Sequence, residues 1–449
     1  MSLPAEVDVL VVGAGPAGLA TACSLLAHGV RADRIAVADA RVEHDRSYSR
    51  ALVVHAKTLE MMERIGCADA VVAAGQEEHS IAFNSLASGR LITYDTSPLK
   101  GKTKYPFVCV IAQSETERVL YSRLQVLLGG GDVHWGMKAV SVRETADGWK
   151  VVGFDGGEEV RARYVVGADG PHSVVRQAAG IAYPDPFDKT GRATSMPADL
   201  DHPSKADEVF CLADVRVDFP PVDPTATGRK PSQPLPREGV NAYLSPHGPS
   251  LWIPFGQGTF RIVGQIMDGE APAAPSKEYV QHMLDTRYPS PAPTITELVW
   301  SSRFYVKFRL AAKYWEEHVP GTPVQAVGAK GGLLIVGDAA HVHSPMGGQG
   351  MNLGIRDSIY LGEALAHCLS PSLSAPDARA LLQRWSDDRH AAGKRVIDLA
   401  GGITFFAANA TGMVEWARDW VLWLVGCVPG MRRMAVWMLS GLGEKSATY

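Results

Sequence analysis

The sequence predicts a two-lobed α/β protein in which a mostly antiparallel sheet interrupts a parallel-sheet domain and a helical tail follows. Three observations support this fold class. Residues 7–39 read as strand, glycine turn, helix and strand, residues 186–312 change to alternating strand-like segments, and strand and helix patterns return after residue 332. Because the pattern of the first lobe resumes only after the second lobe, we expect the two domains to be interleaved.

The N-terminal segment has the pattern of a βαβ unit. The apolar run Val7–Val12 is followed by the glycine-rich stretch Gly13–Gly18, an Ala/Leu-rich helix and the strand-like segment Arg34–Asp39. Asp8 interrupts the apolar run and a turn follows at once, so we expect a buried strand and no targeting segment.

The rest of the first lobe is predicted from periodicity and turn residues. Before the second lobe we expect helices at Lys57–Ile65 and Gln113–Leu128, a hairpin of Lys138–Glu144 and Trp149–Phe154, and a strand at Arg163–Gly167. After it we expect a strand at Gly332–Gly337, a helix at Met351–Leu369, and a helical tail over 395–442 that carries Trp416, Trp420, Trp423 and Trp437.

The second lobe is expected to be rich in strands. Its strands are predicted at Glu208–Val217, Leu251–Phe255 and Thr259–Ile266, with one helix at Lys277–Arg287. The stretch Pro220–Pro236 holds six prolines and no periodic apolar face, so we interpret it as a surface loop.

These transitions predict three parts of the chain. They are a discontinuous first domain over 1–80, 105–185 and 315–400, a sheet domain over 81–104 and 186–314, and a C-terminal helical tail over 401–449.

Composition excludes several functional classes. Hydrophobic residues make up 46% and charged residues 20% of 449, which is typical of an ordinary globular protein. The net charge of −4 and the absence of a long basic run argue against nucleic acid as a partner. The six cysteines are widely spaced, which favours a reducing, cytoplasmic location. No apolar run reaches the roughly 20 residues needed to cross a bilayer.

The first chemical motif is Gly13-Ala-Gly15-Pro-Ala-Gly18, which follows a strand and opens a helix. Glycines in this position let the backbone approach a pyrophosphate at a helix N-terminus. Asp39, about 20 residues further on, can accept hydrogen bonds from a ribose hydroxyl. Tight packing of strand on helix and a solvated carboxylate are the structural alternatives.

Two further motifs follow strand-like segments. The second ends in Asp169-Gly170 and Ser173, whose spacing alone predicts a turn and a capped helix. The third joins Gly337-Asp338 to the glycine-rich Gly347–Gly350, where backbone N–H groups can point at a ligand oxygen or ring nitrogen.

In this order the three motifs resemble those of class A flavoprotein monooxygenases, the para-hydroxybenzoate hydroxylase and phenol hydroxylase type. The match extends over most of residues 7–390. It implies a Rossmann-like FAD-binding domain with an inserted substrate-binding sheet domain. Further matching stretches are Ser49-Arg50-Ala51, Thr58-Leu-Glu60, Gln113 with Glu117 and Leu120, Arg309–Tyr314 and Trp385–Arg389.

The resemblance implies roles for individual residues. Asp39 would hold the adenosine ribose, although the family usually has Glu there, and Asp338 would bind the ribityl or pyrophosphate region. Asp169 would serve FAD binding and, indirectly, the docking of NAD(P)H. Pro345 and Gly348 would line the reactive flavin face as the catalytic positions, and no side-chain base is assigned. The other implied FAD contacts are Gly13, Gly15 and Gly18 at the pyrophosphate, Arg50 and Gln113, and Gly347, Gly348, Gly350, Met351 and Asn352 at the flavin ring.

The activity implied by the resemblance is hydroxylation of a phenol-like or polyketide-like aromatic molecule. NADPH or NADH would reduce FAD, and O2 would react through a C4a-hydroperoxyflavin. We expect no metal site, because His341 and His343 lie two residues apart on a turn with no Cys or Glu cluster nearby. The phenol hydroxylase relatives often add a C-terminal thioredoxin-like domain, for which the apolar tail leaves no room.

Two other functions stay open. One is a membrane-surface FAD epoxidase or reductase acting on a lipid or isoprenoid, with the Trp-rich tail and Arg432 and Arg433 as a peripheral anchor. The other is a non-enzymatic protein similar to GDP-dissociation inhibitors, against which the intact Gly347–Gly350 turn argues. For the tail itself we favour a buried or homodimer-forming helix over membrane contact.

Overall fold

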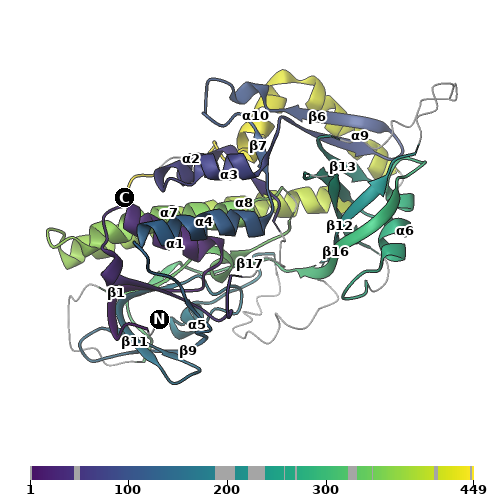
Figure 1. The fold of residues 1–449 in the computed structure, drawn as a ribbon. Coiled ribbons are helices and arrows are strands. Elements are labelled where there is room, and N and C mark those ends of the chain that lie inside the picture. The colour runs from purple at the N-terminus through teal and green to yellow at the C-terminus, as the bar shows by residue number, and fades with distance from the viewer. Residues whose placement is uncertain are drawn as a thin grey trace.

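The computed structural model describes residues 3–44, 51–187, 208–220, 238–256, 258–267, 271–321, 331–345, 347–408, 413–444 and 447–449. Two large sheets lie at opposite ends of the molecule, and long helices run between them (Figure 1).

The first sheet forms the core of the N-terminal lobe. Its central strand β1 (Glu6–Val12) pairs in parallel with β2 (Ile35–Asp39) and with β11 (Glu159–Gly167). Val7 to Val12 are all buried, because helices or other strands cover this strand on both faces. The remaining strands are β8 (His134–Trp135) beside β2, β19 (Gly332–Ile335) and β18 (Trp315–Glu316) beyond β11, and the hairpin β9 (Ala139–Glu144) and β10 (Lys150–Phe154), which pairs antiparallel with β11.

The second sheet draws strands from two distant parts of the chain. In spatial order it contains β16 (Thr294–Val306), β12 (Glu208–Asp218), β15 (Thr259–Ile266), β14 (Ser250–Pro254), β13 (Val240–Leu244), β5 (Ser80–Ser85) and β6 (Gly89–Asp95). Only the β13–β5 pair is parallel. Helix α6 (Lys277–Arg287) packs on one face, over a cluster in which Trp252 stacks on Phe260.

Two small sheets connect the lobes. One contains β3 (Val53–Val54), β7 (Val108–Val110) and β4 (Gln76–Glu78), and the other pairs β17 (Arg309–Leu310) with β20 (His341–Val342). An apolar cluster of Leu52, Val110, Val240 and Ile253 joins the first of them to the second large sheet.

Helices cover the first sheet in a packed layer. Helix α1 (Pro16–Ala27) lies along α7 (Gly350–Leu369), and Ser24 Oγ donates to the Ile359 carbonyl at 2.7 Å. Gly362 permits this approach, because a Cβ there would lie 2.3 Å from the Ser24 Cβ. The other helices of this lobe are α2 (Ala56–Arg64), α3 (Ala68–Ala74), α4 (Gln113–Leu127) and α5 (Val174–Ala178).

The C-terminal part consists of α8 (Ala375–Ala408), α9 (Met413–Cys427) and α10 (Pro429–Leu439). Helices α9 and α10 pack on β6, at the top of the molecule in Figure 1, far from β1 and β11. Among the described residues, no helix combines the length and the apolar character required of a membrane span.

Buried charges tie the chain end to the first lobe. Glu444 pairs with Arg389 and, at 3.1 Å, with Arg356, while Asp357 accepts from Arg389 at 2.6 Å and lies 2.7 Å from His341. Burial raises the pKa of Glu444, but Arg356 and Arg389 outweigh it and bring that pKa to about 2. Each charge is compensated, as burial requires.

The predicted α/β fold with an inserted sheet is confirmed, and the helix over Lys277–Arg287 has the predicted bounds. The strand expected over Gly332–Gly337 is shorter. It ends at Ile335, because Gly337 with a φ of +60° turns the chain out of the strand direction, and Gly337–Ala339 form a 3₁₀ turn. The proline-rich loop lies almost entirely outside the described residues, and the domain bounds remain a prediction.

Replacing Gly362 with Ala tests the α1–α7 contact. We expect the free energy of unfolding to fall, because overpacking against Ser24 costs about 1–3 kcal/mol and outweighs a helix-propensity gain of about 1 kcal/mol. Gly402→Ala in α8 is the matched control, since a Cβ there meets no atom within 4 Å and should stabilise. Urea unfolding of both variants measures the difference. If both substitutions changed the free energy of unfolding by the same amount, close packing at Gly362 would be contradicted.

Candidate functional site

The turn between β1 and α1 closes too tightly for side chains at two of its three glycines. Gly13 has a φ of +103°, and a Cβ there would lie 2.2 Å from the carbonyl oxygen of Ala168. A Cβ on Gly18 would lie 1.8 Å from the carbonyl oxygen of Gly13. At Gly15, the N-cap of α1, a Cβ would meet no atom within 4 Å. Gly13 and Gly18 therefore build the turn, and Gly15 leaves its surface open where helix N–H groups favour phosphate.

The segment around Asp338 packs on the same turn. A Cβ on Gly337 would lie 2.9 Å from the Cβ of Ala17, and one on Gly354 would lie 3.1 Å from the Gly337 Cα. The side chain of Asp338 is exposed, although Gly337 and Ala339 on either side are buried. The structure thus brings the first and third motifs together and turns the Asp338 carboxylate outward beside them.

Asp39 holds the glycine turn in place. One carboxylate oxygen accepts from the Ala14 N–H at 2.6 Å, and the other accepts from the Arg41 N–H at 2.8 Å and the Arg41 Nε at 3.0 Å. Arg41 also donates to the Ala14 carbonyl at 2.9 Å. A carboxylate has about four lone-pair positions, so a ribose hydroxyl would share Asp39 with these partners. Ribose binding by Asp39 stays a prediction.

A polar relay continues from Arg41 to Gln113. Arg41 pairs with Glu117 at 3.2 Å, and Gln113 Nε2 donates to Glu117 at 2.9 Å. Gln113 Oε1 accepts from the Ala51 N–H at 3.2 Å, and the Gln113 N–H donates to the Ala51 carbonyl at 3.0 Å. Arg50, another predicted cofactor contact, lies outside the described residues. The relay therefore holds Ala51, the residue that follows Arg50, next to Gln113.

Ser173 caps α5, as the spacing of the second motif predicts, and Asp169 accepts from the first turn of the same helix. Asp169 Oδ2 accepts from the Val174 N–H at 2.8 Å, and Ser173 Oγ accepts from the Arg176 N–H at 3.0 Å. Asp169 Oδ1 is buried without a partner among the described residues, and burial raises the pKa of this carboxyl. A buried oxygen of this kind calls for a donor that a ligand can supply.

Arg176 and Tyr183 join the second and third motifs. Arg176 donates to the carbonyls of Pro171 at 2.7 Å and Ala339 at 3.0 Å, and its guanidinium lies over the Tyr183 ring. The Tyr183 hydroxyl donates to the Asp338 carbonyl at 2.7 Å. Sequence reasoning assigned neither residue a role. Arg176 stood inside the second motif, whereas nothing in the sequence marked Tyr183.

The glycine turn before α7 presents backbone rather than side chains. Gly347 and Gly348 have φ angles of +95° and +62°, and the Gly348 N–H donates to the Pro345 carbonyl at 2.9 Å. N–H groups in the first helical turn have no helical carbonyl to bond. In α7 these donors belong to Gly350, Met351 and Asn352.

The side chain of Asn352 is used inside the protein. Its Oδ1 accepts from the His55 N–H at 2.8 Å, and its Nδ2 donates to the carbonyls of Val53 at 2.8 Å and Gly348 at 2.7 Å. Any contact of Asn352 with a ligand in this geometry is therefore made by its backbone. The side chain fixes β3 against the glycine turn.

His55 is a residue of this site that sequence reasoning missed, since only the helix after it was matched. Its Nε2 lies 3.0 Å from the Gly347 carbonyl, which can only accept, so Nε2 carries the proton. Its Nδ1 is buried with no partner among the described residues. Burial lowers the pKa of His55 to about 4, so the imidazole is neutral at physiological pH.

Together these features fit an extended dinucleotide such as FAD. Gly15 and Gly347 leave open backbone at the N-terminal ends of α1 and α7. Asp338 is exposed between buried neighbours, and Asp169 and His55 each keep a buried polar atom without a partner. A pyrophosphate fits the α1 end, and an aromatic ring system fits the α7 end.

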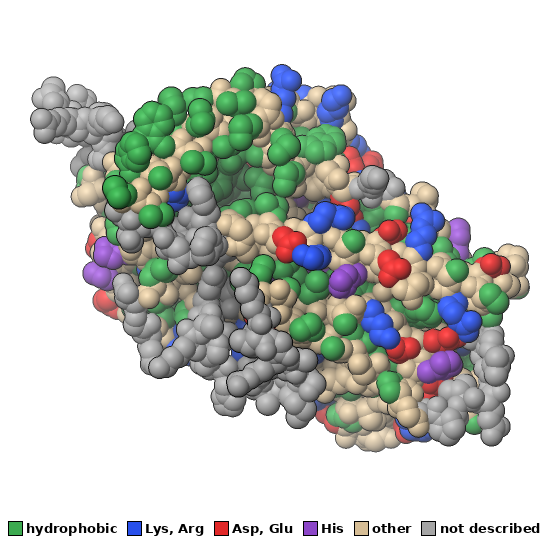
Figure 2. Space-filling view, turned by 180° about the vertical axis from the view of Figure 1, so that it is seen from behind, with side chains coloured by type: hydrophobic (Ala, Val, Ile, Leu, Met, Phe, Trp, Pro, Cys, Tyr) green, Lys and Arg blue, Asp and Glu red, His purple; other side chains and the backbone are tan. Residues whose placement is uncertain are grey.

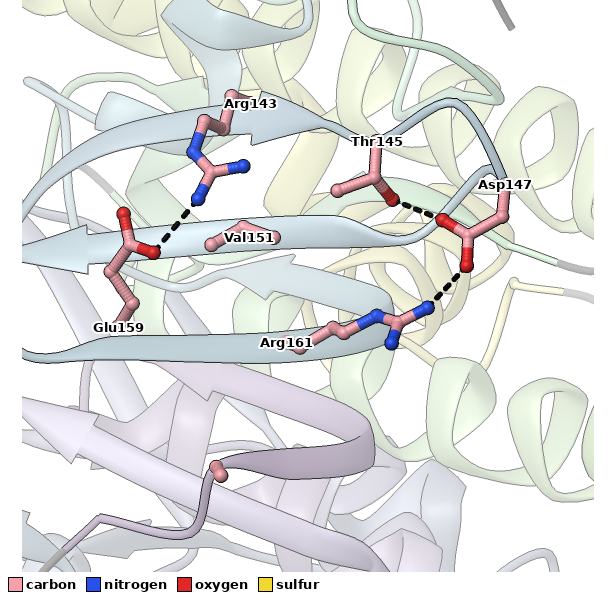
Figure 3. A pocket seen from close by; sticks show the side chains of 7 residues that line it. Arg143, Thr145, Asp147, Val151, Glu159 and Arg161 are labelled. Carbon is pink, nitrogen blue, oxygen red and sulfur yellow. Dashed lines mark hydrogen bonds and ion pairs between the residues drawn. The ribbon is translucent and has the colours of Figure 1, made fainter. Parts of the chain in front are cut away.

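A surface pocket of about 460 Å³ lies elsewhere, on the β9–β10–β11 region (Figure 3). Its charged groups pair with one another, Arg143 with Glu159 at 2.8 Å and Arg161 with Asp147. It contains no residue of the three motifs, and we assign it no catalytic role. Its lining residues are Ala5, Arg143, Thr145, Asp147, Val151, Glu159 and Arg161.

The described parts of the chain contain no group of three or more His, Cys, Asp or Glu side chains arranged to hold a metal ion. His341 instead contacts Asp357, and His343 Nδ1 lies 2.8 Å from the Ser344 carbonyl.

Comparison with known proteins agrees with FAD as the cofactor. Residues 6–216 and 324–400 match a family model described as an FAD binding domain. The chain is 29% identical to the rifampicin monooxygenase of Streptomyces venezuelae, over 87% of this chain and 70% of that protein. It is 31% identical to the 6-methylpretetramide 4-monooxygenase of Streptomyces rimosus, over 100% of this chain and 71% of that protein. Across four such relatives the chain spans 58–71% of their length.

The fold is also similar to a solved structure. The p-nitrophenol 4-monooxygenase of Pseudomonas putida DLL-E4 superposes with a TM-score of 0.77, covering 99% of this chain and 100% of the other. At 20% identity this likeness shows the fold alone.

Gly15→Thr tests the pyrophosphate site. Thr and Gly are similar as N-caps, the backbone at Gly15 is extended, and a Cβ there meets no protein atom. The apoprotein should therefore unfold as the wild type does. The dissociation constant for FAD, measured by flavin fluorescence, should rise at least about tenfold, or 1.4 kcal/mol. Unchanged FAD affinity would show that the pyrophosphate does not lie at Gly15.

His55→Gln tests the buried neutral imidazole. The folded pKa of about 4 lies below the ordinary 6.5, so the unfolded chain takes up a proton first as pH falls. Stability from this group is intact above pH 6.5 and falls by about 1.4 kcal/mol per pH unit toward pH 4. Gln keeps a donor for the Gly347 carbonyl but cannot titrate. The unfolding free energy of the His55→Gln variant should therefore fall less steeply than that of the wild type over this pH range.

The control for this measurement is His79→Gln, because the His79 ring is 58% exposed. Its pH dependence should follow the wild type. If His55→Gln also follows the wild type between pH 6.5 and 4, His55 is not the buried neutral group described above.

Proposed function

Because the chain belongs to the family that carries this FAD-binding domain, we propose that it is an FAD-dependent monooxygenase. It uses NAD(P)H and O2 to hydroxylate a phenol-like or polyketide-like aromatic molecule. The observation that carries the proposal is the meeting of all three motif segments at the Gly13–Gly18 turn. The matched relatives are named as monooxygenases of rifampicin, pentachlorophenol and 6-methylpretetramide.

We assign the dinucleotide end of the site to the first and third motifs. Gly13, Gly15 and Gly18 let the pyrophosphate approach the α1 N-terminus, whose partial positive charge favours it. Asp338 binds the ribityl or pyrophosphate region from its exposed position after Gly337, the residue that packs on Ala17. Asp39 reaches the adenosine ribose while it holds the turn. Arg50 and Gln113 complete this end, and Asp169 serves FAD binding and, indirectly, the docking of NAD(P)H.

We assign the flavin ring to the α7 N-terminus. Backbone N–H groups of the Gly347–Asn352 turn, other than the Gly348 N–H that bonds the Pro345 carbonyl, face the ring and stabilise negative charge on its reduced pyrimidine portion. His55 and Asn352 fix that turn through Gly347 and Gly348. Bound FAD supplies the oxygen-transfer chemistry, and the chain's task is to orient the reactants.

The substrate is expected between the Gly347–Gly348 turn and the second sheet. Val53 touches the turn, since a Cβ on Gly348 would lie 2.2 Å from its Cγ2. Val53 also packs on the cluster of Leu52, Val240 and Ile253, which excludes water from this side. A dry, apolar surface next to the reactive face of the ring suits an aromatic substrate. Pro345 would line that face.

A second candidate function is that of an FAD epoxidase or reductase acting on a lipid. It is favoured by the exposed apolar side chains of α9 and α10. The GDP-dissociation-inhibitor alternative gains no support, because the matched relatives named above are monooxygenases. We propose a cytoplasmic location, in agreement with the six cysteines, all of which are free.

The test follows NAD(P)H oxidation by the purified flavoprotein across a panel of phenols and aromatic polyketides. We expect at least one compound to stimulate oxidation and to yield a hydroxylated product with less peroxide than reductant consumed. Squalene and an isoprenoid serve as the lipid arm. If all consumed reductant appears as peroxide for every aromatic compound, the hydroxylase proposal is contradicted, and turnover of a lipid would support the second candidate.

A further inference from the structure

Helix α9 has its charged residues inside and its apolar residues outside. Arg418 and Asp419 are buried, pair at 2.9 Å, and Asp419 accepts from Ser88 Oγ at 2.8 Å. Glu415 lies 3.6 Å from the same Arg418. The outward side chains include Trp416, Trp420 and Trp423, exposed by 63%, 52% and 47%. This distribution is the reverse of that on an ordinary surface helix.

Helix α10 continues the apolar surface. Met431, Met434 and Trp437 are exposed, while Val436 faces the protein. We call the surface formed by Trp416, Trp420, Trp423, Met431, Met434 and Trp437 the α9–α10 face. Figure 2 shows hydrophobic side chains gathered at the upper end of the molecule, where α9 and α10 lie in Figure 1, with the surface hollowed between them. Contiguous exposed apolar patches of this kind mark interaction sites.

We propose that the α9–α10 face docks the protein on an anionic lipid bilayer, with its tryptophans at the level of the headgroups. Tryptophan is enriched at this depth, where its ring is apolar and its N–H can reach water. Binding is peripheral, because no helix in the described residues can span a bilayer. The proposal does not depend on the substrate or on the proposed function.

The border of the face is positively charged. Arg432 and Arg433 lie on α10, and α10 packs next to Ser97–Leu99, which brings the exposed Lys100 and Lys102 to the same border. Lys and Arg side chains stand along the upper border of the patch in Figure 2. Among the acids nearby, Glu415 pairs with Arg418, and the exposed Asp95, which accepts from the Ser97 N–H, is one carboxylate against these four cations. The border therefore complements anionic headgroups.

The same charge disfavours a second copy as the occupant. In a two-fold dimer through this face, each surface meets an identical one. Where the cationic borders of the two copies come together they repel, and no exposed acid of α9 offsets them. In Figure 1 the face also lies away from the first sheet. Docking would therefore leave the FAD lobe in water.

The test is co-sedimentation of the 449-residue flavoprotein with vesicles of phosphatidylcholine alone or mixed with phosphatidylglycerol. We expect binding to the mixed vesicles that weakens as salt is added. Replacing Trp416, Trp420 and Trp423 together with Ser should lower the vesicle-bound fraction by roughly tenfold or more. Replacing Arg432 and Arg433 with Glu should reduce affinity for the mixed vesicles by about fivefold per residue.

Two controls keep the result interpretable. Val126→Ser with Val140→Ser removes exposed apolar side chains from the first lobe, and it should bind vesicles as the wild type does. Flavin content of each variant reports whether the fold is intact.

The proposal is overturned if the wild type ignores anionic vesicles, or if the triple Trp variant binds them equally well. It is also overturned if sedimentation velocity shows a dimer that the Trp substitutions dissolve, without any vesicle binding by the wild type.

Discussion

Close packing of backbone on backbone at the Gly13–Gly18 turn is the constraint on which the rest of the site depends. Ala168 from the second motif and Gly337 from the third both approach this turn to distances that a side chain at Gly13 or Gly337 would forbid. Strands β1, β11 and β19 lie side by side and parallel to one another in the first sheet, so their carboxyl ends deliver the three motifs to the same edge. Ligands of open α/β sheets bind at such edges, which is why motifs distant in sequence form a single site.

Around this contact, most polar side chains form hydrogen bonds and ion pairs within the protein, so few of them face the ligand. Asp39 and Arg41 bracket Ala14, and the relay through Glu117 reaches Gln113. On the flavin side, the Asn352 side chain donates to carbonyls of β3 and of the glycine turn. What these residues leave for a cofactor is mostly backbone N–H groups at the ends of α1 and α7. A site made of backbone is rigid and tolerates little repositioning.

Much of this arrangement could be predicted from sequence. Glycine turns that follow apolar strands can be recognised from local structural propensity, and the same turns are the ones that bind phosphate or a ring nitrogen. The βαβ unit, the interleaved lobes and the helix after Gly350 follow from periodicity alone. His55 and Tyr183 could not be predicted, since their roles depend on contacts with Gly347 and Asp338 far along the chain. Nor could the orientation of α9, because apolar periodicity does not show which face is covered. Its tryptophans are exposed among the described residues, which contradicts burial within the chain, while the other favoured role, a dimer contact, stays a prediction.

We propose that FAD, held where the three motifs meet, supports the transfer of oxygen from O2 to an aromatic substrate. Turnover under ¹⁸O₂ with the phenol or polyketide that best stimulates NAD(P)H oxidation tests it most directly. We expect a hydroxylated product that carries one ¹⁸O atom, formed only when the chain contains FAD. Product oxygen derived from water, or product formed equally by flavin-free protein, would contradict it.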